Sequence, residues 1–285
     1  MFRDVAVRIA IVLVTTTLLA AMIPSRLAST DAYHVSPREP SFDELAGCIE
    51  DLMLNLPLKR GSCQLQVHHL IAETGKWNQD IRLTPLPVDA SLLRSVDFVL
   101  YVGGNTEAAD AAGIFGLFPH TVDMHILEPV PSFYRELVSR LSGKQRIYLH
   151  NFGLANSTKS VQVSKQAIVG QGTIVMNAPI TSAHINETET LNLLSPGEFL
   201  RHAGIFKERY GMLHVNCEGC EYEMFEALAN AGLLNTFPII QFSFHWYTQV
   251  GSHLGLRYCR IRSYLSRSHK PVVLVPYGWE RWVQL

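Results

Sequence analysis

An apolar segment that ends at two glycines constrains the fold of this chain more than any other feature. Phe98 to Val102 are five consecutive apolar or aromatic residues, the length and composition of a strand buried on both faces. Gly103 and Gly104 follow at once, and residues 106–115 are rich in helix-forming residues. A buried strand, a glycine turn and a helix predict the first unit of a nucleotide-binding α/β domain. In such a unit, backbone N–H groups approach a ligand at the start of the helix.

A second apolar segment, Met124 to Leu127, ends in Glu128-Pro129. A carboxylate at the tip of the second strand, roughly 20 or more residues after the glycine turn, can accept hydrogen bonds from both ribose hydroxyls of a nucleoside. Glu128 is therefore predicted to bind ribose. The alternative is a glutamate that only starts the helix beginning near Pro131.

The alternation of strands and helices continues to the end of the chain. Further strands are expected at 146–150, 212–215 and 239–244, helices at 131–141, 221–231 and 255–265, and a closing pair at 271–275 and 281–283. Residues 159–190 are polar and β-rich, and a capping box at Ser195 predicts a short helix to about Ala203. Repeated β-α-β units predict an α/β fold with a mainly parallel sheet, right-handed crossovers and an antiparallel closing strand.

Candidate site residues follow the strands, because ligands of such sheets bind beyond the carboxyl ends of the strands. They are Gly103, Gly104 and Asn105, then Glu128, then Asn151 and Phe152, then Asn216, Glu218 and Glu221, and finally His245.

Several of these residues have two interpretations. Phe152 can lie against an adenine ring with Asn151 at its edge, or it can be a core phenylalanine beside a turn amide. Glu218 can orient a hydroxyl or ammonium group, whereas Glu221 equally fits the first turn of a helix through the helix dipole. His245 can take a proton from a substrate hydroxyl near neutral pH, or it can pack beside Trp246.

The N-terminus differs from the rest of the chain. Arg3 and Arg8 precede an uncharged apolar segment, residues 9–23, which predicts a signal peptide or, since no clear cleavage site follows, an uncleaved signal anchor. The basic residues place the remainder in the lumen of the secretory pathway (endoplasmic reticulum or Golgi), or outside the cell if the leader is cleaved. The expected organisation is an anchor or signal at 1–23, a stalk at 24–40, a helical preface and cap at 41–97 and the main domain at 98–285.

The cysteines, the sequons and the net charge limit which ligands, modifications and partners we expect. In a lumenal protein, Cys48 and Cys63 can form a disulfide. Cys217-x-x-Cys220 has redox or zinc spacing, but no second pair of ligands lies near it in the sequence, which disfavours a metal site. Asn156 and Asn186 lie in glycosylation sequons. The net charge of −1 disfavours nucleic acid as a partner, since a general nucleic-acid binder needs a basic face.

Taken together, residues 98–246 resemble the FkbM-type family of S-adenosylmethionine-dependent methyltransferases. That family carries D-x-G-x-N-x-G after strand one, E-P after strand two, K-x-D-x-E-G-x-E at strand four and often a Q-x-E-x-H-like segment after strand five. This chain has Gly103 and Asn105, then Glu128-Pro129, then residues 215–221, then 241–245. The Tyr-Val-Gly-Gly-Asn form and the membrane-anchored layout resemble a eukaryotic, methyltransferase-like branch.

The resemblance implies a class I methyltransferase (Rossmann-like) fold and S-adenosylmethionine as cofactor, with methyl transfer to a hydroxyl of a sugar, a glycan or another small molecule. It implies that the segment Tyr101, Gly103, Gly104 and Asn105 holds the methionine portion, Glu128 the ribose, and Asn151 with Phe152 the adenine. Asn216, Glu218 and His245 would face the acceptor.

Three positions depart from the family pattern. Tyr101 and Asn216 each replace an aspartate, and Glu107 replaces the last glycine. These departures favour an alternative, a catalytically silent, membrane-tethered binding domain with the same fold. An NAD-linked oxidoreductase is less favoured because G-x-G-x-x-G is absent.

Overall fold

The computed structural model describes Cys48 and residues 89–164, 168–169, 172–173, 188–205, 209–245, 254–274 and 278–285. The chain divides into two units, 1–35 and 36–285, and all described residues belong to the second. The predicted anchor, the stalk and almost all of the preface lie outside the described residues, as do Cys63, Asn186 and Trp246. Within the described part of the chain, no helix is both long enough and apolar enough to cross a membrane.

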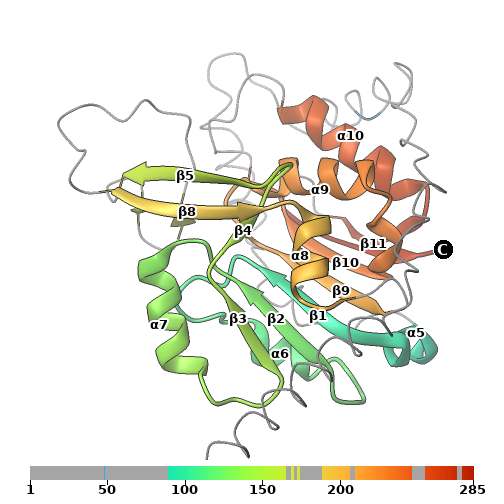
Figure 1. The fold of residues 1–285 in the computed structure, drawn as a ribbon. Helices are drawn as coiled ribbons and strands as arrows, with labels where there is room; N and C mark the ends of the chain where they lie inside the picture. The colour runs from blue at the N-terminus through green and yellow to red at the C-terminus, as the bar shows by residue number, and fades with distance from the viewer. Residues whose placement is uncertain are drawn as a thin grey trace, which may run out of the picture. The chain divides into compact units, whose positions relative to one another are not determined.

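A seven-stranded sheet forms the centre of the described unit (Figure 1). β1 pairs in parallel with β2 on one side and with β9 on the other, whereas β12 runs antiparallel to both of its neighbours, β10 and β11. The predicted α/β fold with a mainly parallel sheet and an antiparallel closing strand is thus confirmed. The strand order is β11-β12-β10-β9-β1-β2-β3, and the bounds are Val96–Val102 (β1), Asp123–Leu127 (β2), Ile147–His150 (β3), Tyr210–Val215 (β9), Ile239–Ser243 (β10), His269–Leu274 (β11) and Trp279–Gln284 (β12).

The described helices are α5 (Ala90–Ser95), α6 (Ala111–Phe115), α7 (Pro131–Leu141), α8 (Pro196–His202), α9 (Glu221–Asn230), the 3₁₀ helix η3 (Leu234–Thr236) and α10 (Leu254–Ser266). Helices α7, α8, α9 and α10 begin and end close to the predicted positions, whereas α5 and η3 were not predicted. The prediction of a helix over 106–115 is wrong in its first half, because the chain forms turns up to Asp110. Asn105 at φ +51° and Ala108 at φ +44° are both left-handed, which excludes a right-handed helix there.

The side chains of β1 alternate between two hydrophobic cores on opposite faces of the sheet. Phe98, Leu100 and Val102 pack in one core with side chains from α8, α9 and α10, whereas Val99 and Tyr101 pack in the other with α6 and α7. Burial on both faces explains why this strand reads as a continuous apolar run.

A second, three-stranded sheet lies beyond β3 in the sequence. It consists of β4 (Gly153–Leu154), β8 (Thr188–Leu194) and β5 (Lys159–Ser164), in the order β4-β8-β5. β8 is parallel to β4 and antiparallel to β5, and the short strands β6 (Ile168–Val169) and β7 (Gly172–Thr173) pair with each other. The β-rich character predicted for residues 159–190 is confirmed where the chain is described.

A disulfide joins Cys48 to Cys259 on α10, across 211 residues of sequence. The predicted pairing of Cys48 with Cys63 is therefore wrong. The side chain of Cys259 is buried in the core that contains Phe98, and Cys48 packs against the same core.

Candidate active site

A cavity of about 350 Å³ lies where β1, β2 and β9 end, a volume within the range of small-molecule sites of about 300–1,000 Å³. Five of the predicted site residues line it: Gly103 and Asn105 after β1, Glu128 after β2, and Asn216 and Glu218 after β9. The structure thus brings together residues that are up to 115 positions apart in the sequence (218 − 103).

Glu128 connects the ends of the first two strands through its carboxylate. One oxygen accepts the backbone N–H of Asn105 at 2.7 Å, and the other accepts that of Val130 at 2.8 Å. The residue is only 4% exposed. Burial raises the pKa of Glu128 to about 7, although the two backbone hydrogen bonds act in the opposite direction.

The glycine turn is shaped by contacts within the protein. The N–H groups of Gly103 and Gly104 both donate to the carbonyl oxygen of Leu127, at 3.1 and 2.9 Å. Gly103 has φ +93°, and a Cβ atom there would lie 2.0 Å from the carbonyl oxygen of Asn216. The prediction that these N–H groups approach a ligand is therefore wrong, since both donate to the end of β2. The missing Cβ of Gly103 allows the backbone at the end of β9 to come close.

Tyr101 is buried on the opposite side of the sheet from Phe98, Leu100 and Val102, so it does not line the cavity. It is 3% exposed, and its ring lies 4.6 Å from the ring of His214, measured between centroids. The position that the resemblance assigned to the methionine portion of the cofactor is thus part of a hydrophobic core.

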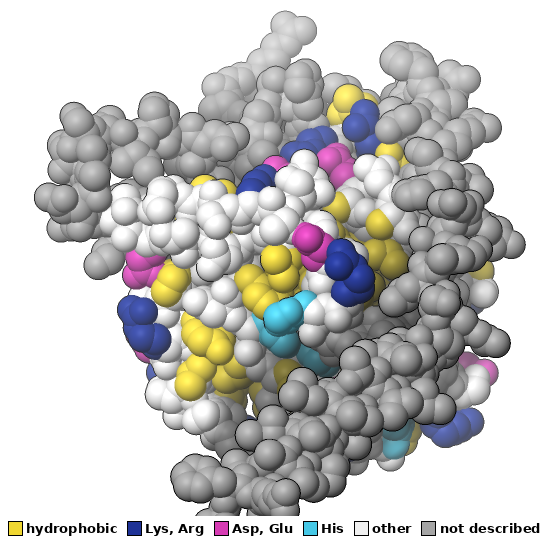
Figure 2. All heavy atoms as spheres, viewed as in Figure 1, with side chains coloured by type: hydrophobic (Ala, Val, Ile, Leu, Met, Phe, Trp, Pro, Cys, Tyr) yellow, Lys and Arg dark blue, Asp and Glu magenta, His cyan; other side chains and the backbone are white. Residues whose placement is uncertain are grey.

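Asn151 and Phe152 are also absent from the cavity lining. The side-chain amide of Asn151 donates to the carbonyl oxygen of Glu128 at 3.0 Å, which fixes the end of β2. Phe152 packs against His150, Phe199 and His202, with ring centroids 5.2 to 6.0 Å apart. Figure 2 shows histidine and hydrophobic side chains next to each other near α8. The packing interpretation of Phe152 therefore agrees with the structure, and the adenine contact predicted for this pair does not.

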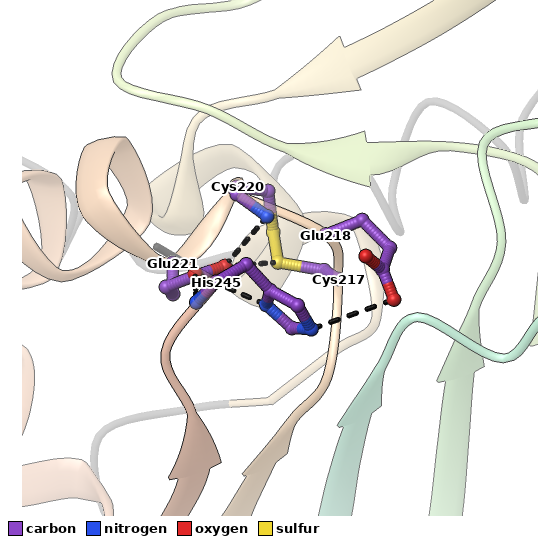
Figure 3. The surroundings of a disulfide bond; sticks show 6 residues. Cys217, Glu218, Cys220, Glu221 and His245 are labelled. Atoms are coloured by element: carbon purple, nitrogen blue, oxygen red, sulfur yellow. Dashed lines mark hydrogen bonds and ion pairs between the residues drawn. A yellow bond between two sulfur atoms is a disulfide. The ribbon is translucent and has the colours of Figure 1, made fainter. Parts of the chain in front are cut away.

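The turn from β9 into α9 carries the residues that the resemblance placed near the acceptor (Figure 3). Glu218 has a left-handed backbone, φ +56°, and its Oε1 lies 3.4 Å from Nε2 of His245. Glu221 is fully buried in the first turn of α9. Its carboxylate accepts the backbone N–H groups of Gly219 (2.9 Å) and His245 (2.7 Å), so it ties this turn to the segment after β10.

His245 is held between two carboxylates. Burial alone would lower its pKa, but the charge of Glu221, 3.1 Å from Nδ1, and the hydrogen bonds to Glu218 and Glu221 outweigh burial and raise the pKa to about 10. The ring is therefore an imidazolium at neutral pH. An imidazolium has no lone pair to accept a proton, so this geometry favours a positioning role for His245, and proton acceptance from a substrate stays a prediction.

A disulfide between Cys217 and Cys220 closes the same turn. Both cysteines are partly exposed and line the cavity. The two cysteines of the C-x-x-C segment therefore form a disulfide at the candidate site.

One wall of the cavity consists of residues that the sequence analysis did not predict as site residues. It is apolar and comes from the start of α7 and from the small sheet: Val130, Phe133, Leu154, Val161, Leu191 and Leu193. The alternation of buried and exposed residues in β8 is the signal that would have indicated this wall. Lys159 and Glu223 form an ion pair of 3.1 Å that also lines the cavity.

No protein-family model and no curated protein sequence matches this chain. Among solved structures, the methyltransferase FkbM from Methylobacillus flagellatus is similar at 12% identity and a TM-score of 0.41, over 66% of this chain and 44% of that one. This chain thus spans less than half of that protein's length. An O-methyltransferase from Bacillus cereus in complex with SAH is similar at 10% identity and a TM-score of 0.38, over 86% of this chain and 92% of that one. The O-methyltransferase TomG from Streptomyces achromogenes, in complex with SAM, is similar at 13% identity and a TM-score of 0.36, over 92% and 99%.

Proposed function

We propose that this chain is an S-adenosylmethionine-dependent methyltransferase that methylates a hydroxyl group of a sugar or another small molecule. The observation that carries the proposal is a cavity that joins Glu128, Glu218 and an apolar wall beyond the carboxyl ends of the strands. This is the part of an α/β sheet where nucleotide-like ligands bind.

Two features of the cavity support the binding of an adenosyl group. Each carboxylate oxygen of Glu128 accepts one backbone N–H, and because each oxygen has two lone pairs, both retain capacity for a ribose hydroxyl. The apolar wall that includes Phe133 and Leu191 offers a surface for a flat aromatic base. These residues replace Asn151 and Phe152 as the proposed adenine contacts.

The residues after β9 would act on the acceptor. When bound, S-adenosylmethionine supplies a methyl group that is already activated by its sulfonium. The carboxylate of Glu218 would accept the proton of the acceptor hydroxyl, and the amide of Asn216 would orient that hydroxyl by hydrogen bonding. The imidazolium of His245 holds the Glu218 carboxylate and is thus a positioning residue. Holding the reacting groups in line supplies much of the rate enhancement in such a reaction.

Isothermal titration of the full chain with S-adenosylmethionine tests the cofactor assignment. We expect the wild-type chain to bind and Glu128→Gln to bind at least about tenfold more weakly, which corresponds to about 1.4 kcal/mol. Glu107→Gln is the matched control, since Glu107 is exposed and pairs only with Arg140 among the interactions described. Absence of binding by the wild-type chain, or equal binding by Glu128→Gln, would overturn the assignment.

Turnover is tested separately with a panel of sugar and small-molecule hydroxyl acceptors. Glu218→Gln removes the proton acceptor, so we expect it to lose methyl transfer while it retains cofactor binding. Equal loss of binding and turnover would contradict the role given to Glu218.

A second function is favoured by one observation. Oε1 of Glu218 lies 3.4 Å from Nε2 of His245, so the ion pair occupies a carboxylate oxygen that would otherwise face the acceptor hydroxyl. A catalytically silent domain that binds an adenosyl ligand fits this arrangement. Cofactor binding without turnover on the whole acceptor panel would support it.

We further propose a lumenal location behind an N-terminal membrane anchor, the layout of the eukaryotic branch named above. Two disulfides support an oxidising compartment, and the sequon residue Asn156 is exposed. Expression in a secretory host tests this: we expect a glycan on Asn156 that Asn156→Gln removes. A glycan-free chain whose main domain faces the cytosol would refute the location.

A further inference from the structure

The Cys217–Cys220 disulfide differs from the other disulfide in its surroundings. Both of its cysteines are partly exposed and line the cavity, so a small thiol reagent can reach the sulfur atoms. In the Cys48–Cys259 disulfide, Cys48 is also partly exposed, but Cys259 is 1% exposed in a hydrophobic core and neither cysteine lines the cavity. Of the two disulfides, one therefore presents both of its cysteines to the cavity, and the other buries one of its two.

The Cys217–Cys220 disulfide encloses Glu218. The ring that it closes contains Glu218 at φ +56° and Gly219 at φ +108°. A left-handed conformation costs a residue with a side chain about 1–2 kcal/mol, so it persists only where the surroundings impose it. Figure 3 shows Glu218 directed toward His245 from this ring, with the sulfur atoms beside Glu221.

We propose that Cys217–Cys220 is a thiol–disulfide exchange site that controls the position of Glu218 in the cavity. Its consequence for turnover rests on the proposed function, whereas the exchange itself does not. The co-reactant is a small dithiol, because a second thiol in the same molecule completes the exchange and leaves as a disulfide.

The exchange proceeds in two balanced steps. One thiolate of the dithiol attacks Sγ of Cys217, the S–S bond breaks, and its electron pair leaves on Sγ of Cys220. Cys220 is the N-cap of α9, where the helix dipole stabilises a thiolate. The second thiol of the reagent then attacks the mixed disulfide and releases Cys217, so the protein gains two electrons and two protons and the reagent leaves as a disulfide.

The reduced turn has a hydrogen bond ready for one of its thiols. Sγ of Cys217 lies 3.4 Å from Oε2 of Glu221, so the new S–H group can donate to that carboxylate. Without the covalent ring, residue 218 can leave the left-handed region, and its carboxylate separates from His245. A carboxylate that has left His245 can turn the oxygen of that ion pair toward the acceptor hydroxyl, so we expect faster methyl transfer in the reduced state.

Selective reduction is the first test. The full chain is treated with N-ethylmaleimide to block free thiols, incubated with increasing dithiothreitol, alkylated with iodoacetamide and analysed by mass spectrometry. We expect Cys217 and Cys220 to be labelled at a dithiothreitol concentration about tenfold or more below that needed for Cys48 and Cys259. Labelling of both pairs at the same concentration, or of Cys48 and Cys259 first, would overturn the proposal.

Access to Glu218 is the second test. A water-soluble carbodiimide modifies exposed carboxyl groups, and fully buried Glu221 serves as the control within the same peptide. We expect reduction to speed the labelling of Glu218 but not of Glu221. Unchanged labelling of Glu218 on selective reduction would overturn the control of its position.

Two double variants complete the design. Cys217→Ser/Cys220→Ser should show fast labelling of Glu218 with or without dithiothreitol, whereas Cys48→Ser/Cys259→Ser should keep the response of the wild-type chain. If Cys217→Ser/Cys220→Ser does not fold, the labelling of Glu218 in the wild-type chain before and after selective reduction still tests the proposal.

The two proposals fail in different ways. Selective reduction with release of Glu218, but no cofactor binding in either redox state, refutes the methyltransferase and leaves the exchange site standing. Methyl transfer at the same rate in both redox states, with no change in labelling of Glu218, refutes the exchange site and leaves the methyltransferase standing.

Discussion

Replacement of Glu128 by glutamine should change how the stability of the protein depends on pH. The carboxyl group is buried and accepts backbone hydrogen bonds from Asn105 and Val130, and its pKa is raised from 4.5 to about 7, primarily by burial. Glutamine has nearly the same shape but does not titrate. The difference in stability between the two proteins therefore isolates the ionisation of one side chain.

The sign and size follow from linkage. A carboxyl group with a raised pKa binds its proton more tightly in the folded state, so its contribution to stability is fully present below pH 4.5 and is lost as pH rises through 7. At 1.36 kcal/mol for each pH unit, a pKa that moves from 4.5 to about 7 corresponds to about 3 kcal/mol. Over this window the wild-type protein should lose about 3 kcal/mol relative to Glu128→Gln.

Urea unfolding followed by tryptophan fluorescence at several pH values between 4.5 and 8 measures this difference. Glu107→Gln is the control, since it makes the same change at an exposed glutamate. If the curves of wild type and Glu128→Gln run parallel across the window, Glu128 does not ionise in a buried setting. The description of the cavity would then be incorrect.

Three further predictions test other parts of the site. The pKa of His245 is raised to about 10, so His245→Gln should destabilise the protein at pH 7 and progressively less as pH rises through 10. Equal destabilisation at pH 7 and at pH 10, measured by urea unfolding, would refute the imidazolium. Gly143 and Gly103 both have positive φ, but of the two only Gly103 lacks space for a Cβ. In the same assay, Gly143→Ala should lower the free energy of unfolding by about 1–2 kcal/mol, and Gly103→Ala should lower it by about 1–3 kcal/mol more. Equal losses would contradict the close approach of Gly103 to Asn216. Phe133 lines the cavity and Phe152 does not, so Phe133→Ala should weaken S-adenosylmethionine binding in calorimetry while Phe152→Ala leaves it unchanged; the reverse result would restore the adenine site expected from the sequence.

The strands were predictable because burial leaves a direct mark on sequence. Phe98 to Val102 is continuous and apolar since both faces of β1 are covered, and Pro131 marks the start of α7 because its missing N–H is not needed there. The segment before α6 was not predictable. Its composition favours a helix, but the backbone N–H of Asn105 donates to the carboxylate of Glu128 at 2.7 Å, and Asn105 is left-handed. Tertiary structure therefore overrides propensity here.

The candidate site was predictable as a set of strand ends but not as a set of roles. Glu218, Glu221 and His245 could each be singled out from the sequence, yet the protonation of His245 depends on distances between all three side chains. The pairing of Cys48 with Cys259 likewise depends on the fold, since cysteine spacing does not determine connectivity.

The place of β12 in the main sheet has a consequence for synthesis of the protein. β12 lies between β10 and β11, so β11 leaves the ribosome before the strand that attaches it to the sheet. Until residues 279–284 emerge, a nascent chain exposes the backbone donors and acceptors along the edge of β10, where another extended segment can pair. A released chain truncated before residue 279 would therefore expose this edge of β10 and be more prone to aggregation than the wild-type chain.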